Sequence, residues 1–390
     1  MTSVYSGFRP RQGVPPTSAR RPFEWPPELE HFRQLARDGL AEPFRGITTD
    51  GALVDGLFPL RRAGASTRRL REAAEALLAV LTPAQRADAC FRLDSDLWRA
   101  WSNVHLYIVR HGACLEDLSA AQRELALTLV GEALSAEGLT SARNVMRLNH
   151  TIGEITGRRE DYGEWYYWLS LFGTPSADEP WGWQLDGHHL ILNCLVVGDQ
   201  LVLAPVFMGS EPVRAETGRY AGTRVFEAEE ARGAALMRAL TPAQRARAII
   251  GDQVPRDVLA GQFHDNLVLP YEGIRHDELT GEQQGLLSDV IDAYVGRLHP
   301  DHAALKREEV RAHLAETHFA WRGDGDAAGV FYYRVHSPVL LIEFDHLPGI
   351  ALDNDYPSRH HIHTVVRTPN GNDYGKDLLR QHYALHHRAG

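Results

Sequence analysis

Apolar residues in this chain fall into continuous runs that predict strands. Leu190–Val197 and Leu201–Phe207 flank Gly198-Asp199, which predicts two strands joined by a tight turn. Val330–Val335 and Val339–Phe344 predict a second hairpin. Continuous apolar runs are typical of strands buried on both faces, so we expect helices to cover the sheet.

Helices are predicted where apolar residues recur with helical spacing. These segments are Ser66–Val80, Ala120–Leu134, Glu227–Leu240, Glu282–Leu298, Lys306–Thr317 and Gly375–His387. Four capping phrases, each with Thr or Ser followed three residues later by Gln, begin at Thr82, Ser119, Thr241 and Thr280. In such a phrase the hydroxyl accepts from the first helical turn and the Gln side chain reaches back. Each phrase therefore predicts a helix start.

The order of these signals repeats along the chain. Two capping phrases precede each hairpin, and 183–193 align with 333–343 without a gap. The predicted class is α+β, with a helical N-terminal third followed by helix-covered β-hairpins. An internal duplication of a helix-helix-hairpin unit explains the repetition, and chance is the alternative. We expect a loosely ordered segment over 1–24 and a single large domain over 25–390. Within it the pseudo-repeat halves would span 72–210 and 230–350, and a closing strand and helix would span 360–390.

Composition excludes several classes of protein. With 44% hydrophobic and 24% charged residues, the 390-residue chain has an ordinary globular composition. A formal charge of -10 argues against a nucleic-acid partner, because such binding depends on clustered cations. The three cysteines lack the paired spacing of a thiolate zinc site or a redox dithiol. The first residues contain no apolar signal-peptide core and nothing suggests a membrane partner, so we expect a cytoplasmic protein.

Histidines open two of the predicted strands. His361 and His363 alternate along an apolar strand, so both side chains point to one face and can chelate one ion. His188 and His189 precede the first hairpin, and His189 is the better ligand because it shares a strand face with Asn193. Imidazole suits iron, copper or zinc. The alternative is a set of buried core histidines bonded to backbone carbonyls.

Further residues are candidates for the same site. Glu343 and Asp345 alternate on one strand face, and either could be an oxygen ligand, a partner that orients an imidazole, or a general base. Arg367 follows the His361–His363 strand on the same face, which suits either a substrate carboxylate or a structural pairing with Asp373. His382 stands four residues before His386 in the closing helix. It is a weaker metal-ligand candidate, because a terminal helix rich in His is often solvated.

Several blocks together resemble a known family. They are Phe172–Ser176, Pro180–Gln184, Gly187–Leu190, His361–Val365 and Asn372–Gly375. The combination resembles the bacterial and fungal family catalogued as domain of unknown function thirty-five-hundred, over about Glu72 to His387. The resemblance supports treating these blocks as the functional region without naming a reaction. Some members of the family look exported through a signal segment, and this chain departs from them in lacking one.

The leading hypothesis is an enzyme with one transition-metal ion held by His189, His361 and His363. Glu343, Asp345 or His188 would complete or orient the set. With iron or copper the expected chemistry is oxidation of a small polar metabolite. Arg367 would bind the carboxylate of this metabolite. With zinc, hydrolysis is expected, with Glu343 or Asp345 as base. The rival from another class is a metal-free protein that binds a small ligand. The oligomeric state is left open.

Overall fold

The computed structural model describes residues 5–14 and 30–386 and has the mixed α+β architecture expected. In the first half, the helices are α1 (Glu30–Ala41), α2 (Arg68–Val80), α3 (Pro83–Ala89), α4 (Ala120–Ala133) and α5 (Ala136–Thr156). The strands of this half are β1 (Cys90–Phe91), β2 (Ala113–Cys114), β3 (Tyr167–Phe172), β4 (Trp181–Gly187), β5 (Leu190–Val197) and β6 (Gln200–Ser210). The predicted hairpin is therefore the β5–β6 pair.

The second half contains the same kinds of element. Its helices are α6 (Glu227–Ala239), α7 (Pro242–Ala248), α8 (Gly281–Val295), α9 (Pro300–Ala312) and α10 (Lys376–His386). Its strands are β7 (Ile249–Gly251), β8 (Ile274–Arg275), β9 (His318–Gly323), β10 (Phe331–His336), β11 (Leu341–Leu347) and β12 (Ser358–Arg367). Short 3-10 helices lie at Asp96–Arg99, Leu115–Asp117, His276–Glu278, Leu314–Glu316 and Asp373–Gly375.

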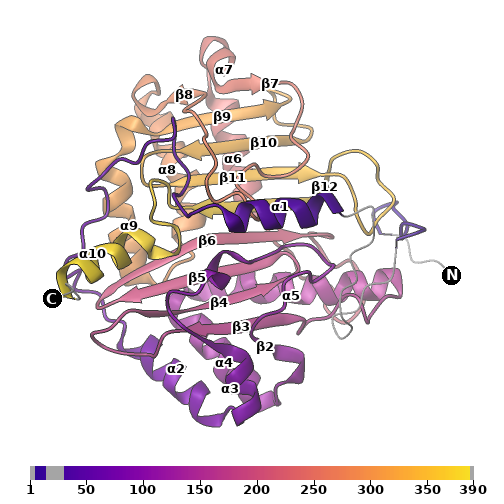
Figure 1. Ribbon diagram of the computed structural model, residues 1–390. Coiled ribbons are helices and arrows are strands. Elements are labelled where there is room, and N and C mark those ends of the chain that lie inside the picture. Colours follow the sequence, from indigo (N-terminus) through magenta and orange to yellow (C-terminus); the bar gives the residue numbers. More distant parts are fainter. Residues whose placement is uncertain (1–4, 15–29, 387–390) are drawn as a thin grey trace.

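All of these strands belong to one sheet of twelve, which runs through the whole molecule (Figure 1). The order is β1-β3-β4-β5-β6-β12-β11-β10-β9-β7, with β2 paired to β3 and β8 paired to β9. The order is symmetrical about its centre, where β6 and β12 pair antiparallel. The first and second halves of the chain therefore meet at this central strand pair.

The pairing register also recurs. Trp183 pairs with Leu171, and Tyr333, 150 positions after Trp183, pairs with Trp321, which lies 150 positions after Leu171. The next strand keeps the same offset, because Gln184 pairs with Asn193 and Arg334 pairs with Glu343. The gap-free alignment of 183–193 with 333–343 thus matches equivalent positions in the sheet.

The four predicted capping boxes are confirmed. The side chains of Thr82, Ser119, Thr241 and Thr280 each accept from the backbone of the Gln three residues on, and each Gln returns a contact to the cap. The Gln side chains also join the helices in each half. Gln122 donates to Gln85 over 2.9 Å, and Gln283 donates to Gln244 over 2.9 Å. The caps therefore fix helix packing as well as helix starts.

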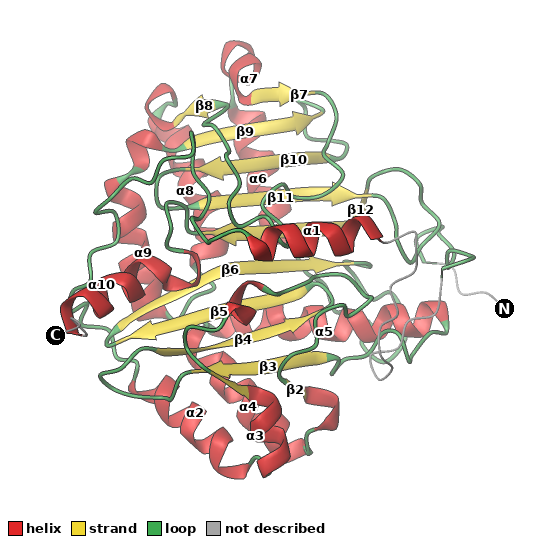
Figure 2. Cartoon of the chain, viewed as in Figure 1, coloured by secondary structure: helices red, strands yellow, loops and turns green. Residues whose placement is uncertain are grey.

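The two faces of the sheet are covered differently (Figure 2). Helices pack on one face, where the Tyr333 hydroxyl lies 2.6 Å from that of Tyr294 in α8. Helix α1 and long loops cross the other face. There the Asp186 carboxylate accepts from the Ser102 amide, and Glu343 accepts from the amides of Leu259 and Ala260. The expectation of helices on both faces is thus correct for one face only.

The N-terminal segment expected to be loosely ordered, 1–24, falls partly outside the described residues, which omit 1–4 and 15–29. The described part is anchored to the loop after β11. Pro10 forms a β-bridge with Leu352, and the Arg11 guanidinium donates to the carbonyls of Leu352 and Gly349.

Candidate metal centre

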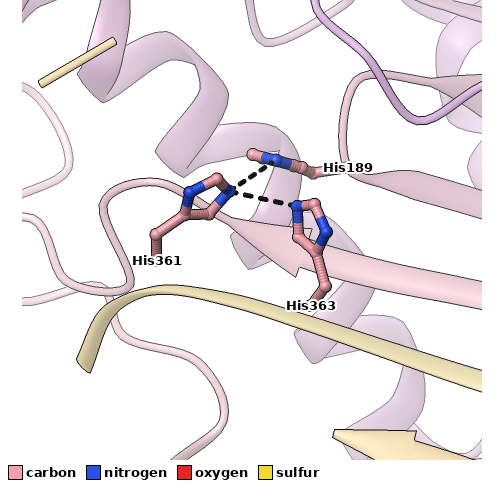
Figure 3. A group of neighbouring side chains, drawn as sticks. All are labelled: His189, His361 and His363. Carbon is pink, nitrogen blue, oxygen red and sulfur yellow. Dashed lines mark hydrogen bonds between the residues drawn. The ribbon is translucent and has the colours of Figure 1, made fainter. Parts of the chain in front are cut away.

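Three of the predicted ligands come together from two distant parts of the chain (Figure 3). The Nε2 atom of His361 lies 3.3 Å from that of His189 and 3.0 Å from that of His363. One ligand atom from each ring lies within 4.8 Å of the other two, and all three residues are buried. Among the described residues they form the one group of three or more His, Cys, Asp or Glu side chains with such spacing.

The local backbone explains how each ring reaches the site. His361 and His363 alternate on β12 and therefore share a face. His189 lies in the β4–β5 turn with a φ of 63°, which corrects the expectation that it belongs to a regular strand. Its backbone is fixed on both sides, because its N–H donates to the Asn103 carbonyl and its carbonyl accepts from Gly209.

Gly209 leaves the space that the rings occupy. It pairs with His363 across β6 and β12. A Cβ atom at this position would lie 2.6 Å from Cδ2 of His363 and 3.1 Å from Cδ2 of His189. Real Cβ atoms do not approach other atoms as closely as the first of these distances, so the site requires glycine here.

The hydrogen bonds of the rings fix two of the tautomers. Nδ1 of His361 lies 2.7 Å from the Pro348 carbonyl oxygen, and Nδ1 of His363 lies 2.7 Å from Oδ1 of Asp257. Both partners are acceptors, so each Nδ1 carries the proton and donates. A neutral ring has only one N–H, so when both rings are neutral their Nε2 atoms present lone pairs to each other at 3.0 Å.

Burial favours the uncharged form of His189 and His361. Burial, together with the neighbouring histidines, lowers the pKa of His189 well below its usual value. Burial and the charge of His363 lower the pKa of His361 to about 3. Near neutral pH, protonation of His189 or His361 is therefore unfavourable and does not relieve the repulsion between the lone pairs.

The spacing fits a transition metal. Metal–imidazole bonds are about 2.0–2.1 Å long, so adjacent ligand atoms in octahedral or tetrahedral sites lie about 3.0–3.4 Å apart. The two measured separations, 3.0 and 3.3 Å, fall in this range. The contacts from Nδ1 to Asp257 and Pro348 are those that commonly orient histidine ligands. Three protein ligands leave positions open for water, dioxygen or substrate.

Glu343 and Asp345 are both fully buried but differ in their surroundings. Glu343 accepts from the amides of Leu259 and Ala260 and from the hydroxyl of Tyr332, so it anchors the loop that carries Asp257. Asp345 pairs with His363 in the β11–β12 register, and neither of its oxygens has a hydrogen-bond partner in the described structure. Burial and the charges of Asp257 and Glu343 raise the pKa of Asp345 well above its usual value.

Two predicted metal ligands lie outside the group. The ring of His188 stacks on that of His189 at 3.9 Å, but its Nδ1 contacts Oδ1 of Asn149 at 2.7 Å. His382 belongs to α10, where its Nε2 lies 3.5 Å from Glu179. It lines a hollow next to the β5–β6 turn, whereas His189 lies at the opposite ends of those strands. The structure therefore does not bring His382 together with the three clustered histidines.

Arg367 has a structural environment. Its side chain is fully buried, with Nη2 2.8 Å from Asp265 and Nε 3.0 Å from Asp373. The two carboxylates compensate the buried guanidinium, so it is not free to grip a substrate carboxylate. The alternative interpretation, pairing with Asp373, is the one that the structure bears out.

Sequence reasoning missed Asp257, Gly209 and the Pro348 carbonyl. No pattern links Asp257, in the loop between β7 and β8, to a histidine 106 residues away. A lone glycine inside an apolar strand is a recognised signal of close backbone approach, so Gly209 could have been found.

A sequence family described as "Protein of unknown function (DUF3500)" matches residues 63–376. No curated protein and no solved structure matches the chain. Within the described residues, no helix is both long enough and apolar enough to span a membrane. The matched range includes all three clustered histidines and Asp257.

Proposed function

This chain belongs to the DUF3500 family, and we propose that it is a mononuclear transition-metal enzyme that oxidises a small polar metabolite. One observation carries the proposal: three buried Nε2 atoms converge while two of the rings are held as Nδ1–H tautomers. Such an arrangement is repulsive without a cation and becomes a ligand set with one. Iron or copper bound there would supply the redox chemistry.

The state of the neighbouring carboxyl groups favours oxidation over hydrolysis. Hydrolysis by a zinc-activated water gains from a nearby carboxylate base. Glu343 already accepts three hydrogen bonds, and Asp257 already accepts from His363. Burial raises the pKa of Asp345, which favours its protonated form in the metal-free protein and makes it a candidate proton donor. A zinc hydrolase remains the alternative function.

The residues divide into three roles in this proposal. His189, His361 and His363 bind the metal. Asp257 orients His363, and Glu343 positions the loop that carries Asp257. Asp345 stands beside His363, because directly opposed residues on adjacent strands have neighbouring side chains. In this proposal Asp345 supplies a proton to the bound substrate.

Elemental analysis of the purified protein tests the proposal. We expect up to one iron or copper per chain, retained through dialysis and lost in a His361→Ala/His363→Ala variant. His382→Ala/His386→Ala is the matched control, because it removes two spaced histidines from α10 and should leave the metal in place. A zinc content of one per chain would favour the hydrolase. A folded protein that takes up none of the three metals would overturn the proposal in favour of a metal-free ligand-binding protein.

We also propose that the two halves arose by internal duplication. The symmetrical strand order, the constant register offset of 150 residues and the matched Gln85–Gln122 and Gln244–Gln283 pairs support it. The backbone contacts between the halves support it too. The Ser135 amide donates to the Arg297 carbonyl, and the His299 amide donates to the Ala133 carbonyl, in a reciprocal arrangement.

A further inference from the structure

A cavity of about 280 Å³ lies at the end of the central strands remote from the three histidines. Its walls come from α9, the beginning of β6 and the segment Leu57–Pro59. His189, in contrast, precedes β5, and β6 passes His189 near its end, at Gly209. The cavity and the candidate metal centre are therefore separate sites.

The cavity occupies the position in one half that the histidines occupy in the other. At the register offset of 150 residues, Val339 corresponds to His189. Leu195 and Asp345, which are 150 positions apart, pair with Val202 and His363, so Val202 corresponds to His363 and Gln200 corresponds to His361. None of these three equivalent positions carries a histidine, so this position cannot hold a metal in the same way.

Two polar side chains from α9 face the apolar walls of the cavity. His302 is 5% exposed and lines the cavity. Lys306 donates from Nζ to the Val339 carbonyl over 2.8 Å and contacts Glu309. An ammonium group has three hydrogens, so one remains for a ligand. The opposing surface includes Phe58, Leu203 and Leu340, which are all buried.

We propose that this cavity binds a small amphiphilic carboxylate, whose oxygens accept from Lys306 and His302 while its hydrocarbon chain lies along the apolar walls. A water molecule takes about 30 Å³, so the cavity has room for a ligand of about nine non-hydrogen atoms. Apolar walls with a few convergent polar groups are typical of small-molecule sites. Burial lowers the pKa of His302 to about 4, so its ring is neutral and keeps one N–H to donate. The inference does not depend on the metal-dependent function.

Titration calorimetry with hexanoate on the full-length protein tests the proposal, with hexanol and hexylamine as probes of the same length. Hexanoate should bind at one site per chain and at least tenfold more tightly than the other two. Equal binding of hexanol, or no binding of hexanoate at millimolar concentration, would overturn the proposal. These wild-type measurements do not depend on the folding of any variant.

Substitutions at the two sites test where hexanoate binds. Lys306→Met should weaken hexanoate binding at least tenfold, while Arg311→Met removes a positive charge from an exposed position of the same helix and should leave binding unchanged. The His361→Ala/His363→Ala variant should also bind hexanoate normally. Loss of binding in that double variant would place the carboxylate at the histidines, and would overturn the cavity site without affecting the proposed metal chemistry.

Discussion

The Nε2 atoms of His361 and His363 lie 3.0 Å apart, and in the neutral rings each Nδ1 donates the only proton to an oxygen elsewhere. The fold thus imposes a repulsive contact between two lone pairs inside the protein. A bound cation would convert this contact into shared coordination.

Asp257 should raise metal affinity through His363. Its carboxylate fixes the ring by accepting from Nδ1, and loss of such an orienting partner commonly weakens metal binding 10–100-fold. We expect a loss of about this size in Asp257→Ala, measured by competition with a chromophoric chelator. Asp252→Ala, at an exposed position of the same loop, is the control. Equal affinities in the two variants would remove Asp257 from the site.

Gly209→Ala should damage the centre by crowding. The added methyl group would press against His363 and His189, and overpacking of a tight interior typically costs about 1–3 kcal/mol. We expect a lower melting temperature and a metal content well below that of wild type. Gly285→Ala, in α8, meets no atom within 4 Å and should be neutral or stabilising. Full metal occupancy in Gly209→Ala would contradict the packing argument.

Arg367→Met should destabilise the whole fold. It leaves the buried carboxylate of Asp373 without its partner, whereas Asp265 keeps its ion pair with Arg99, and breaking a buried ion pair costs about 3–5 kcal/mol. Denaturant unfolding measures the loss. Arg359→Met removes an exposed partner of Glu230 and should cost at most about 1 kcal/mol. Wild-type stability with impaired substrate binding in Arg367→Met would instead restore a role in substrate recognition.

His336 should make the metal-free protein sensitive to acid. Burial and the charge of Arg334 lower its pKa to about 3, whereas an unfolded histidine titrates near 6.5. Between these values the unfolded chain binds the proton and the folded chain does not, so stability falls as the pH falls through this window. One such group contributes about 1.4 kcal/mol per pH unit.

The test of that pH dependence is a substitution of similar shape. In chelator-treated protein, His336→Phe should reduce the slope of unfolding free energy against pH by about 1.4 kcal/mol per unit between pH 6 and 4. His386→Phe changes an exposed histidine near the end of α10 and should leave the slope unaltered. An unchanged slope in His336→Phe would mean that the ring takes up its proton in the folded state.

Local signals in the sequence predicted much of the fold. The capping phrases marked four helix starts, and the apolar runs located β5, β6, β10 and β11, because both signals depend on neighbouring residues. Helix α5 escaped prediction, since its apolar positions are interspersed with polar ones such as Asn149 and Thr151 that are buried by tertiary contacts. Local sequence patterns also could not show that long loops cover one face of the sheet.

The sequence predicted the candidate site only where its residues are close together in the chain. Alternation along β12 indicated that His361 and His363 share a face, and the structure places them together. The strand pattern around His189 led to the right residue but the wrong backbone conformation, because residues 188 and 189 form the turn between β4 and β5. Arg367 was ambiguous, since a strand pattern cannot show whether Asp265, 102 residues away, supplies the counter-charge.

The pairing of β6 with β12 has a further consequence for how chemistry is distributed over the polypeptide. One half supplies a single imidazole, at His189, and the other half supplies two, at His361 and His363. A protein made of either half alone would contain an incomplete set of imidazole ligands. The complete group of three imidazoles is thus a property of the joined chain.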